Sequence, residues 1–375
     1  MEDPLPLARD LIRRRSVTPA DDGAIGLVAG WLERRGFRCT PLRFGEIENL
    51  WATRGEGGPH FCFAGHTDVV PPGDGGWSCD PFAAVERDGL LFGRGAVDMK
   101  GAIAAFVAAL PERSPGRISL LITGDEEGPA RDGTARVVDW LRARDEVPDM
   151  ALVGEPTSVA VLGDTIKIGR RGSLNAVLRV EGVQGHVAYP DRADNPVHRL
   201  IAGLASLLAQ PLDAGTAWFP PSSLQVTSID VGNAATNVIP ARATARLNIR
   251  FNDLHDAASL EARILRAMDA AGARCVAEFD RSADAFVTRP GPFVEALRRA
   301  VRRSTGVEPR LDTGGGTSDA RFLAPLCPVA ELGPVGTTMH KADECVPVAE
   351  LRALSALYAS VMAECLHGSV APAGT

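Results

Sequence analysis

The sequence predicts an α/β domain that is interrupted by a smaller α+β domain. Three apolar runs of strand length are separated by segments with helical spacing of apolar residues, and polar residues follow each run. Continuous apolar strands are typical of a sheet that is covered on both faces. From about residue 173 the pattern changes to alternating strands and amphipathic helices, and the first pattern later returns. We therefore expect one domain from residues 1–172 and 286–375, and a second from residues 173–285.

The spacing of apolar residues places the individual elements. In the larger domain we expect helices over residues 5–15, 24–35, 101–110, 134–144 and 348–366. The three buried strands are expected over residues 61–64, 118–123 and 150–153. In the smaller domain, strands are expected over residues 174–180, 223–231 and 243–251, and helices over residues 195–209 and 256–271.

Composition excludes several classes of protein. The 375 residues are 45% hydrophobic and 23% charged, which is enough for a large core and excludes disorder for the bulk of the chain. The net charge of −7 argues against nucleic acid as a partner. Because the sequence has neither a long apolar run nor a secretion signal, we expect a cytoplasmic location without membrane attachment. The 7 cysteines include no C-x-x-C pair, so we expect reduced thiols that bind no metal.

Histidine and acidic side chains follow the three expected strands of the larger domain. They are His66 and Asp68, then Glu126 and Glu127, then Glu155, with Asp98 and His340 elsewhere in the chain. The carboxyl ends of strands in an open α/β sheet meet at one cleft, so we expect these groups to gather there. Imidazole and carboxylate ligands without thiolate suit zinc, with cobalt or manganese as substitutes. Two such ions lower the pKa of a bound water toward ~7, and hydrolysis is the reaction we predict.

The spacing within two of these motifs suggests separate roles. Asp68 lies two residues after His66, so its carboxylate is placed to orient the imidazole ring. Adjacent side chains point apart, so one of Glu126 and Glu127 can hold metal while the other carries a proton. Taken singly, each acidic residue is more often part of a solvated turn, and each histidine is more often structural, than a metal ligand. Their joint occurrence after three strands makes a metal site about as well supported as these alternatives.

Five segments of the chain resemble the M20 family of metal-dependent hydrolases. They are residues 65–73, 93–101, 125–128, 154–156 and 339–345, in the order in which the family has them. The resemblance implies a zinc-peptidase-like catalytic domain with a mixed, mostly parallel sheet. It also implies that the inserted domain is a lid through which the protein forms a homodimer.

The same resemblance implies a role for each site residue. Two zinc ions per subunit would be held by His66, Asp98, Glu127, Glu155 and His340. Asp98 would bridge the ions, with His66 and Glu155 on one and Glu127 and His340 on the other. Glu126 would be the general base, and Asp68 would support His66. The peptide bond after Asp98 is expected to be cis.

Four further segments resemble the branch of the family that acts on N-succinyl-LL-2,6-diaminopimelate. They are residues 165–173, 184–190, 236–240 and 314–322. The implied reaction is hydrolysis of the succinyl amide to succinate and LL-2,6-diaminopimelate, a precursor of lysine and of the cell wall. One alternative is another N-acyl amino acid substrate, such as acetylornithine. A second is an inactive scaffold that dimerises and binds a partner, although every expected ligand and the base are present.

The implied substrate is a small molecule with several carboxylates, which an acidic protein must meet with local cations and amides. The matching positions are Lys167, Arg170, Tyr189, Asn237, Arg250, Gly316 and Thr317. The resemblance also implies that His186 reaches from one subunit into the cleft of the other and binds the scissile carbonyl. The run Gly314–Gly316 lacks the following Lys-Ser/Thr of a phosphate loop, so we expect no nucleotide there.

Overall fold

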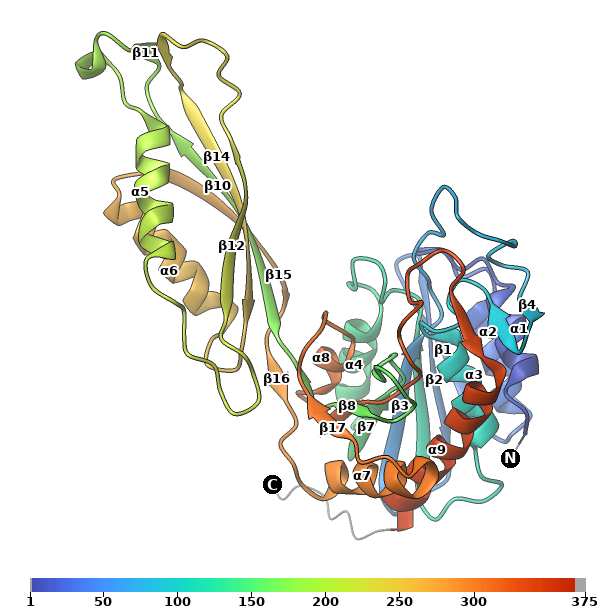
Figure 1. Ribbon diagram of the computed structural model, residues 1–375. Helices are drawn as coiled ribbons and strands as arrows, with labels where there is room; N and C mark the ends of the chain where they lie inside the picture. Colours follow the sequence, from blue (N-terminus) through green and yellow to red (C-terminus); the bar gives the residue numbers. More distant parts are fainter. Residues whose placement is uncertain (1, 368–375) are drawn as a thin grey trace. The chain divides into compact units, whose positions relative to one another are not determined.

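The computed structural model describes residues 2–367, which form two compact units (Figure 1). Unit 1 contains the chain up to Ile168, Thr288–Asp312 and the chain from Ser318 onward, and unit 2 contains Gly169–Val287 and Thr313–Thr317. Hydrogen bonds tie the short segment Thr313–Thr317 to the rest of unit 2. Arg170 donates to the Gly314 carbonyl at 3.2 Å, and Thr313 donates through its hydroxyl to the Trp218 carbonyl at 2.5 Å.

Unit 1 is built on an eight-stranded mixed sheet with the order β1-β2-β6-β3-β7-β18-β8-β17. The strands are β1 (Arg38–Phe44), β2 (Ile47–Arg54), β3 (His60–His66), β6 (Arg117–Thr123), β7 (Met150–Val153), β8 (Thr165–Lys167), β17 (Arg310–Asp312) and β18 (Val329–Glu331). The neighbours β6, β3, β7 and β18 run parallel, whereas β1 and β2 are antiparallel. Every residue of β3 and β7 is buried, as expected for a sheet covered on both faces. The predicted α/β class is confirmed.

Helices and a small second sheet complete unit 1. The helices are α1 (Leu5–Ile12), α2 (Ala24–Glu33), α3 (Lys100–Ala109), α4 (Thr134–Arg142), α7 (Pro292–Thr305), α8 (Ala320–Leu323) and α9 (Val348–His367). The small sheet joins β19 (Cys345–Pro347), β5 (Leu90–Phe92) and β4 (Val85–Arg87). Phe106 of α3 stacks on Phe63 of β3 with ring centroids 4.1 Å apart, and Tyr358 of α9 meets Phe63 edge-on. These aromatic contacts fix α3 and α9 against the middle of the large sheet.

Unit 2 is a four-stranded antiparallel sheet with two helices on one face (Figure 1). The strand order is β12 (Ser223–Asp230), β14 (Arg242–Phe251), β10 (Gly172–Glu181) and β15 (Arg274–Ala283). Residues of β14 alternate between buried and more exposed positions, and the buried side chains pack on α5 (Pro196–Leu208) and α6 (Ala257–Ala270). Two short ladders stand outside this sheet: β11 (Gly185–His186) pairs with β13 (Val238–Ile239), and β9 (Gly169–Arg170) pairs with β16 (Phe286–Val287).

Among the described residues, none of the helices combines the length and the apolar character needed to cross a bilayer. The seven cysteines, all of them in the described part of the chain, are free thiols.

The stability of unit 1 should depend on the protonation of His60, a buried residue at the start of β3. Burial lowers the pKa of His60 from 6.5 to about 4, and its Nε2 atom lies 2.9 Å from the Ser119 hydroxyl. An unfolded chain binds the proton more readily, so stability is lost as pH falls from 6.5 toward 4. The loss attributable to this group is about 3 kcal/mol.

Urea unfolding between pH 7 and pH 4 measures this effect. We expect a shallower pH dependence for the variant His60→Asn than for the unchanged protein. Equal slopes for the two proteins would show that His60 does not titrate in this way.

Candidate metal centre

Three adjacent parallel strands deliver most of the site residues to one edge of the large sheet. His66 is the last residue of β3, Glu126 and Glu127 follow β6, and Glu155 follows β7. The middle strand β3 pairs with both of the others. The remaining two groups come from loops: Asp98 precedes α3, and His340 lies between β18 and β19.

The Asp98 carboxylate lies between two histidines. Its Oδ1 atom is 3.2 Å from His66 Nε2, and its Oδ2 atom is 3.2 Å from His340 Nε2. Glu155 Oε1 approaches His66 Nε2 at 3.8 Å, and Glu127 Oε1 approaches His340 Nε2 at 2.8 Å. The ligand atoms of His66, Asp98 and Glu155 lie within 4.8 Å of one another, as do those of Asp98, Glu127 and His340. All five expected ligands are therefore brought together, in two groups that share Asp98.

Asp68 supports the site in a different way from the one expected. The His66 Nδ1 atom is 2.9 Å from the backbone carbonyl of Asp68 but 3.6 Å from its carboxylate. The carboxylate instead accepts hydrogen bonds from the backbone amides of Glu126 and Glu127, at 3.2 and 3.0 Å. The carbonyl therefore orients the imidazole and leaves Nε2 directed at Asp98 and Glu155. The carboxylate fixes the turn that carries the two glutamates.

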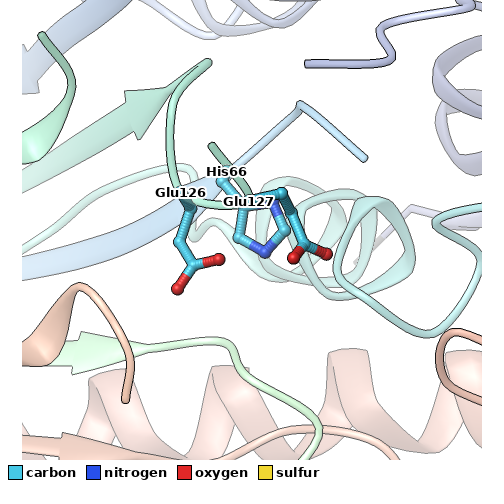
Figure 2. Close-up of side chains that lie close together, drawn as sticks. All are labelled: His66, Glu126 and Glu127. Carbon is cyan, nitrogen blue, oxygen red and sulfur yellow. The ribbon is translucent and has the colours of Figure 1, made fainter. Parts of the chain in front are cut away.

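The side chains of Glu126 and Glu127 lie on either side of the His66 ring (Figure 2). Glu127 also contacts His340, whereas Glu126 belongs to a third possible ligand group with His66 and Glu127. Burial, partly offset by His66 and reinforced by neighbouring carboxylates, raises the pKa of Glu126 well above its usual value. Among those carboxylates is Asp319, which was not predicted to lie at the site.

The electrostatics of the cluster fit a bound cation. Burial and the nearby carboxylates of Asp98 and Glu126 raise the pKa of Glu155, whose buried Oε1 atom has no hydrogen-bond partner. Hydrogen bonds to Asp98 and Glu127 raise the pKa of His340 to about 10. Burial opposes ionisation of Asp98, but hydrogen bonds to His340 and His66 outweigh it and lower its pKa. Clustered carboxylates need positive charge nearby, and metal ions are the usual source of that charge.

The backbone around Asp98 is held by residues that were not predicted. The Glu344 carboxylate accepts hydrogen bonds from the amides of Val97 and Asp98, at 2.9 and 3.2 Å. It also accepts a hydrogen bond from the buried Arg94 guanidinium at 2.7 Å. Both Arg94 and Glu344 lie inside segments that resemble the M20 family, but nothing in their spacing showed that they would meet.

Close packing places the Asp98 loop against the strand ends. The peptide bond between Asp98 and Met99 is cis, as the resemblance predicted. The Met99 side chain packs on two glycines: a Cβ atom at Gly65 would lie 2.6 Å from Met99 Cε, and one at Gly154 would lie 2.7 Å from it. Larger residues at either glycine would push Met99, and with it Asp98, away from the strand ends.

The expected substrate contacts fall into separate groups. Lys167, at the end of β8 in unit 1, forms an ion pair with Asp312. In unit 2, Arg170 donates a hydrogen bond to the carbonyl of Gly314, which is close in sequence to Gly316 and Thr317. Arg250 of β14 lies opposite Ser173 of β10, three residues after Arg170. His186, Tyr189 and Asn237 gather at the ladder of β11 and β13, where the Asn237 carbonyl accepts from the Val187 amide at 3.1 Å.

The two groups in unit 2 lie at opposite ends of that unit. β10 runs from Gly172, near Arg170, to Glu181, near the His186 ladder. Ten strand residues span about 30 Å, and Figure 1 shows β11 and β16 at opposite ends of the unit. A substrate the size of a modified amino acid is too short to contact both groups in one chain.

Solved structures of two peptidases have the same fold as this chain. Aminopeptidase PepT from Bacillus cereus matches with a TM-score of 0.76 at 18% identity, covering 97% of this chain and 98% of that one. The Bacillus subtilis YXEP protein, a dinuclear metal binding peptidase from the M20 family, matches with a TM-score of 0.72 at 16% identity, covering 97% of this chain and 98% of that one. At these identities the likeness establishes the fold.

The family follows from the sequence comparisons. The model of peptidase family M20/M25/M40 matches residues 62–364, and the chain belongs to this family. It is 63% identical to the succinyl-diaminopimelate desuccinylase of Acidiphilium cryptum over 365 residues, which cover 96% of this chain and 98% of the relative. It is 59% identical to the enzyme of the same name from Gluconacetobacter diazotrophicus over 370 residues, which cover 96% of both chains. The expected family is thereby confirmed.

We predict that Glu344 is needed for the stability of unit 1. The change Glu344→Ala removes the acceptor of two amides and leaves Arg94 buried without its partner carboxylate. Breaking a buried ion pair in this way costs about 3–5 kcal/mol. Glu344→Gln keeps an acceptor oxygen and should lose less. Urea unfolding of the three proteins measures the difference, and a loss below about 1 kcal/mol in Glu344→Ala would contradict the assignment.

Proposed function

We propose that this chain hydrolyses the amide of N-succinyl-LL-2,6-diaminopimelate to succinate and LL-2,6-diaminopimelate, with two zinc ions per subunit. The observation that carries the proposal is the Asp98 carboxylate, which lies between two groups of histidine and carboxylate ligands. The substrate follows from the name shared by the relatives at 63% and 59% identity over nearly the full length. Zinc follows from the ligands, which are imidazole and carboxylate without thiolate.

The five ligands divide between two ions in a simple way. His66 and Glu155 would hold one ion, Glu127 and His340 would hold the other, and Asp98 would bridge them. When bound, such a pair polarises the amide carbonyl and lowers the pKa of a water molecule toward ~7. Cobalt has similar ligand preferences and is expected to substitute for zinc.

Glu126 is the group best placed to move the proton. Its carboxylate lies beside His66, whereas the Glu127 carboxylate contacts His340. In the proposed reaction Glu126 accepts a proton from the attacking water as the bond from oxygen to the amide carbon forms. It then gives that proton to the amine nitrogen as the carbon–nitrogen bond breaks. The Asp68 carboxylate holds Glu126 in place by accepting a hydrogen bond from the Glu126 backbone amide.

Cations and amides near the start of unit 2 suit the substrate carboxylates. Burial, together with repulsion from Arg171, lowers the pKa of Arg250. An anion between such guanidinium groups would relieve that repulsion, and arginine binds carboxylates through paired hydrogen bonds. Gly316 is exposed and has open space around it, so its backbone can approach a ligand closely. In unit 2 we assign Arg170, Arg250, Gly316 and Thr317 to carboxylate binding. Lys167, in unit 1, is assigned the same role.

The far end of unit 2 is proposed to serve the cleft of a second subunit. His186 and Tyr189 are exposed, with ring centroids 5.7 Å apart, and Asn237 lies next to them. Because this group is about 30 Å from Arg170 along β10, it suits the substrate of a partner chain. Exposed apolar side chains of unit 2, among them Ile201, Leu208 and Ile229, offer surface for a homodimer. A cytoplasmic location is part of the proposal, since free thiols suit a reducing compartment.

A panel of substrates tests the proposed activity. The zinc-loaded protein should show its highest kcat/KM with N-succinyl-LL-2,6-diaminopimelate, and far lower values with succinyl-ornithine and acetylornithine. A preference for acetylornithine would instead assign the chain to the related deacylases. No hydrolysis of any of these compounds, together with no bound metal, would favour an inactive scaffold.

The variant Glu126→Gln tests the role of the base. The amide keeps the shape of the side chain but cannot accept the proton. We therefore expect kcat to fall about 100-fold to 10,000-fold while the metal content stays the same. Glu112→Gln, in the turn between α3 and β6, is a matched control that should keep full activity. Full activity of Glu126→Gln would show that another group moves the proton.

Mixed dimers test the contribution of His186. Loss of one donor to the developing oxyanion costs on the order of a hundredfold or more in kcat, so His186→Ala should be nearly inactive. Mixed with Glu126→Gln under conditions of subunit exchange, it should regain activity, because one of the two clefts then has both groups intact. No recovery after exchange has been shown by mass spectrometry would contradict catalysis across the dimer.

A further inference from the structure

The loop between β6 and α4 carries both Glu126 and Glu127. It spans residues 124–133, and we refer to it as the glutamate loop. Asp68 binds the amides of the two glutamates on the side of the loop that faces the metal centre. A second set of buried polar contacts holds the two ends of the loop, and the mechanism proposed above does not use it.

Asn49 of β2 contacts both ends of the glutamate loop. Its side-chain amide donates to the Asp132 carbonyl at 3.0 Å, near the end of the loop. Its side-chain oxygen accepts from the Thr123 hydroxyl at 2.7 Å, and that hydroxyl in turn accepts from the Asp125 amide at 3.2 Å, near the start of the loop. Asn49 and Thr123 are paired across β2 and β6, and both are fully buried.

Asp125 closes the glutamate loop from within. Its Oδ2 atom accepts from the amides of Arg131 and Asp132, at 2.9 and 3.0 Å, and the side chain is buried. Two glycines leave room for these contacts. A Cβ atom at Gly128 would lie 2.5 Å from Asp125 Oδ1, and one at Gly133 would lie 2.5 Å from Thr123 Oγ1.

We propose that Asn49 and Asp125 are positioning residues for the proposed hydrolysis, acting through the glutamate loop to set the place of the Glu126 carboxylate. Neither residue belongs to any of the candidate ligand groups. A side chain that replaced Asn49 would leave the Asp132 carbonyl and the Thr123 hydroxyl without their buried partner, and the loop ends would move apart. Small displacements of a catalytic group lower the rate strongly, so the effect should appear in kcat.

This inference rests on the proposed function, and its test combines activity with a measurement that does not depend on substrate. Asn49→Ala should lower kcat on the order of a hundredfold, with KM and zinc content little changed. Hydrogen–deuterium exchange should increase in the peptides that cover residues 124–133 and stay unchanged in those that cover β3. The matched control is Ser355→Ala, which removes a buried hydrogen bond to the Ala105 carbonyl, at 2.9 Å, between α9 and α3.

Asp125 provides a second, conservative pair of variants. Asp125→Asn keeps an oxygen for the amides of Arg131 and Asp132 and should restore most of the kcat that Asp125→Ala loses. A structural role alone would lower stability in Ser355→Ala, Asn49→Ala and Asp125→Ala alike, without a selective loss of kcat. Equal kcat in Asn49→Ala and Ser355→Ala, or unchanged exchange in the glutamate loop, would overturn the proposal.

The activity measurement and the exchange measurement distinguish a failure of this inference from a failure of the proposed function. Should the unchanged protein fail to hydrolyse the succinylated substrate, the function fails, and the exchange data alone decide whether Asn49 holds the loop. Should Asn49→Ala fail to fold, the Asp125 pair carries the same comparison.

Discussion

The arrangement of unit 1 depends on the crowding of carboxylates around Asp98. Asp98, Glu126, Glu127 and Glu155 converge with only two histidines among them, and burial and mutual repulsion raise the pKa of Glu126 and Glu155. Such a group is unfavourable without added positive charge. Neighbouring residues hold these side chains together. Glu344 binds the backbone amide of Asp98, and Asp68 binds the backbone amide of Glu127. Gly65 leaves space for the side chain of Met99, the residue after Asp98.

Sequence patterns predicted the parts of the molecule that follow from periodicity. Helices such as α3 and α9 begin or end within one residue of the expected positions, because amphipathic spacing reports which side faces the core. The gathering of His66, Glu126, Glu127 and Glu155 was predicted because the ends of β3, β6 and β7 share one edge of a parallel sheet. The antiparallel pair of β1 and β2 and the helix α7 were not predicted, although α7 has a strongly amphipathic sequence.

What the sequence did not reveal are the contacts between residues far apart in the chain. The pairs Arg94 with Glu344 and Asn49 with Asp132 are separated by 250 and 83 positions, and no local spacing reports such partners. For Asp68 the sequence predicted the right residue but the wrong group. Its position two residues after His66 indicated a contact with the imidazole, but the backbone carbonyl of Asp68 is nearer to the ring than its carboxylate. A carboxylate is recognised in a sequence, whereas a carbonyl is common to every residue.

We propose that two metal ions share Asp98, and counting the bound metal tests this proposal. Zinc-loaded protein should contain two equivalents of zinc per chain by mass spectrometry after exhaustive dialysis. The variant His340→Ala should contain one, because it loses a ligand of one ion and leaves His66, Asp98 and Glu155 for the other. One equivalent or none in the unchanged protein, or two equivalents in His340→Ala, would contradict a pair of ions that shares Asp98.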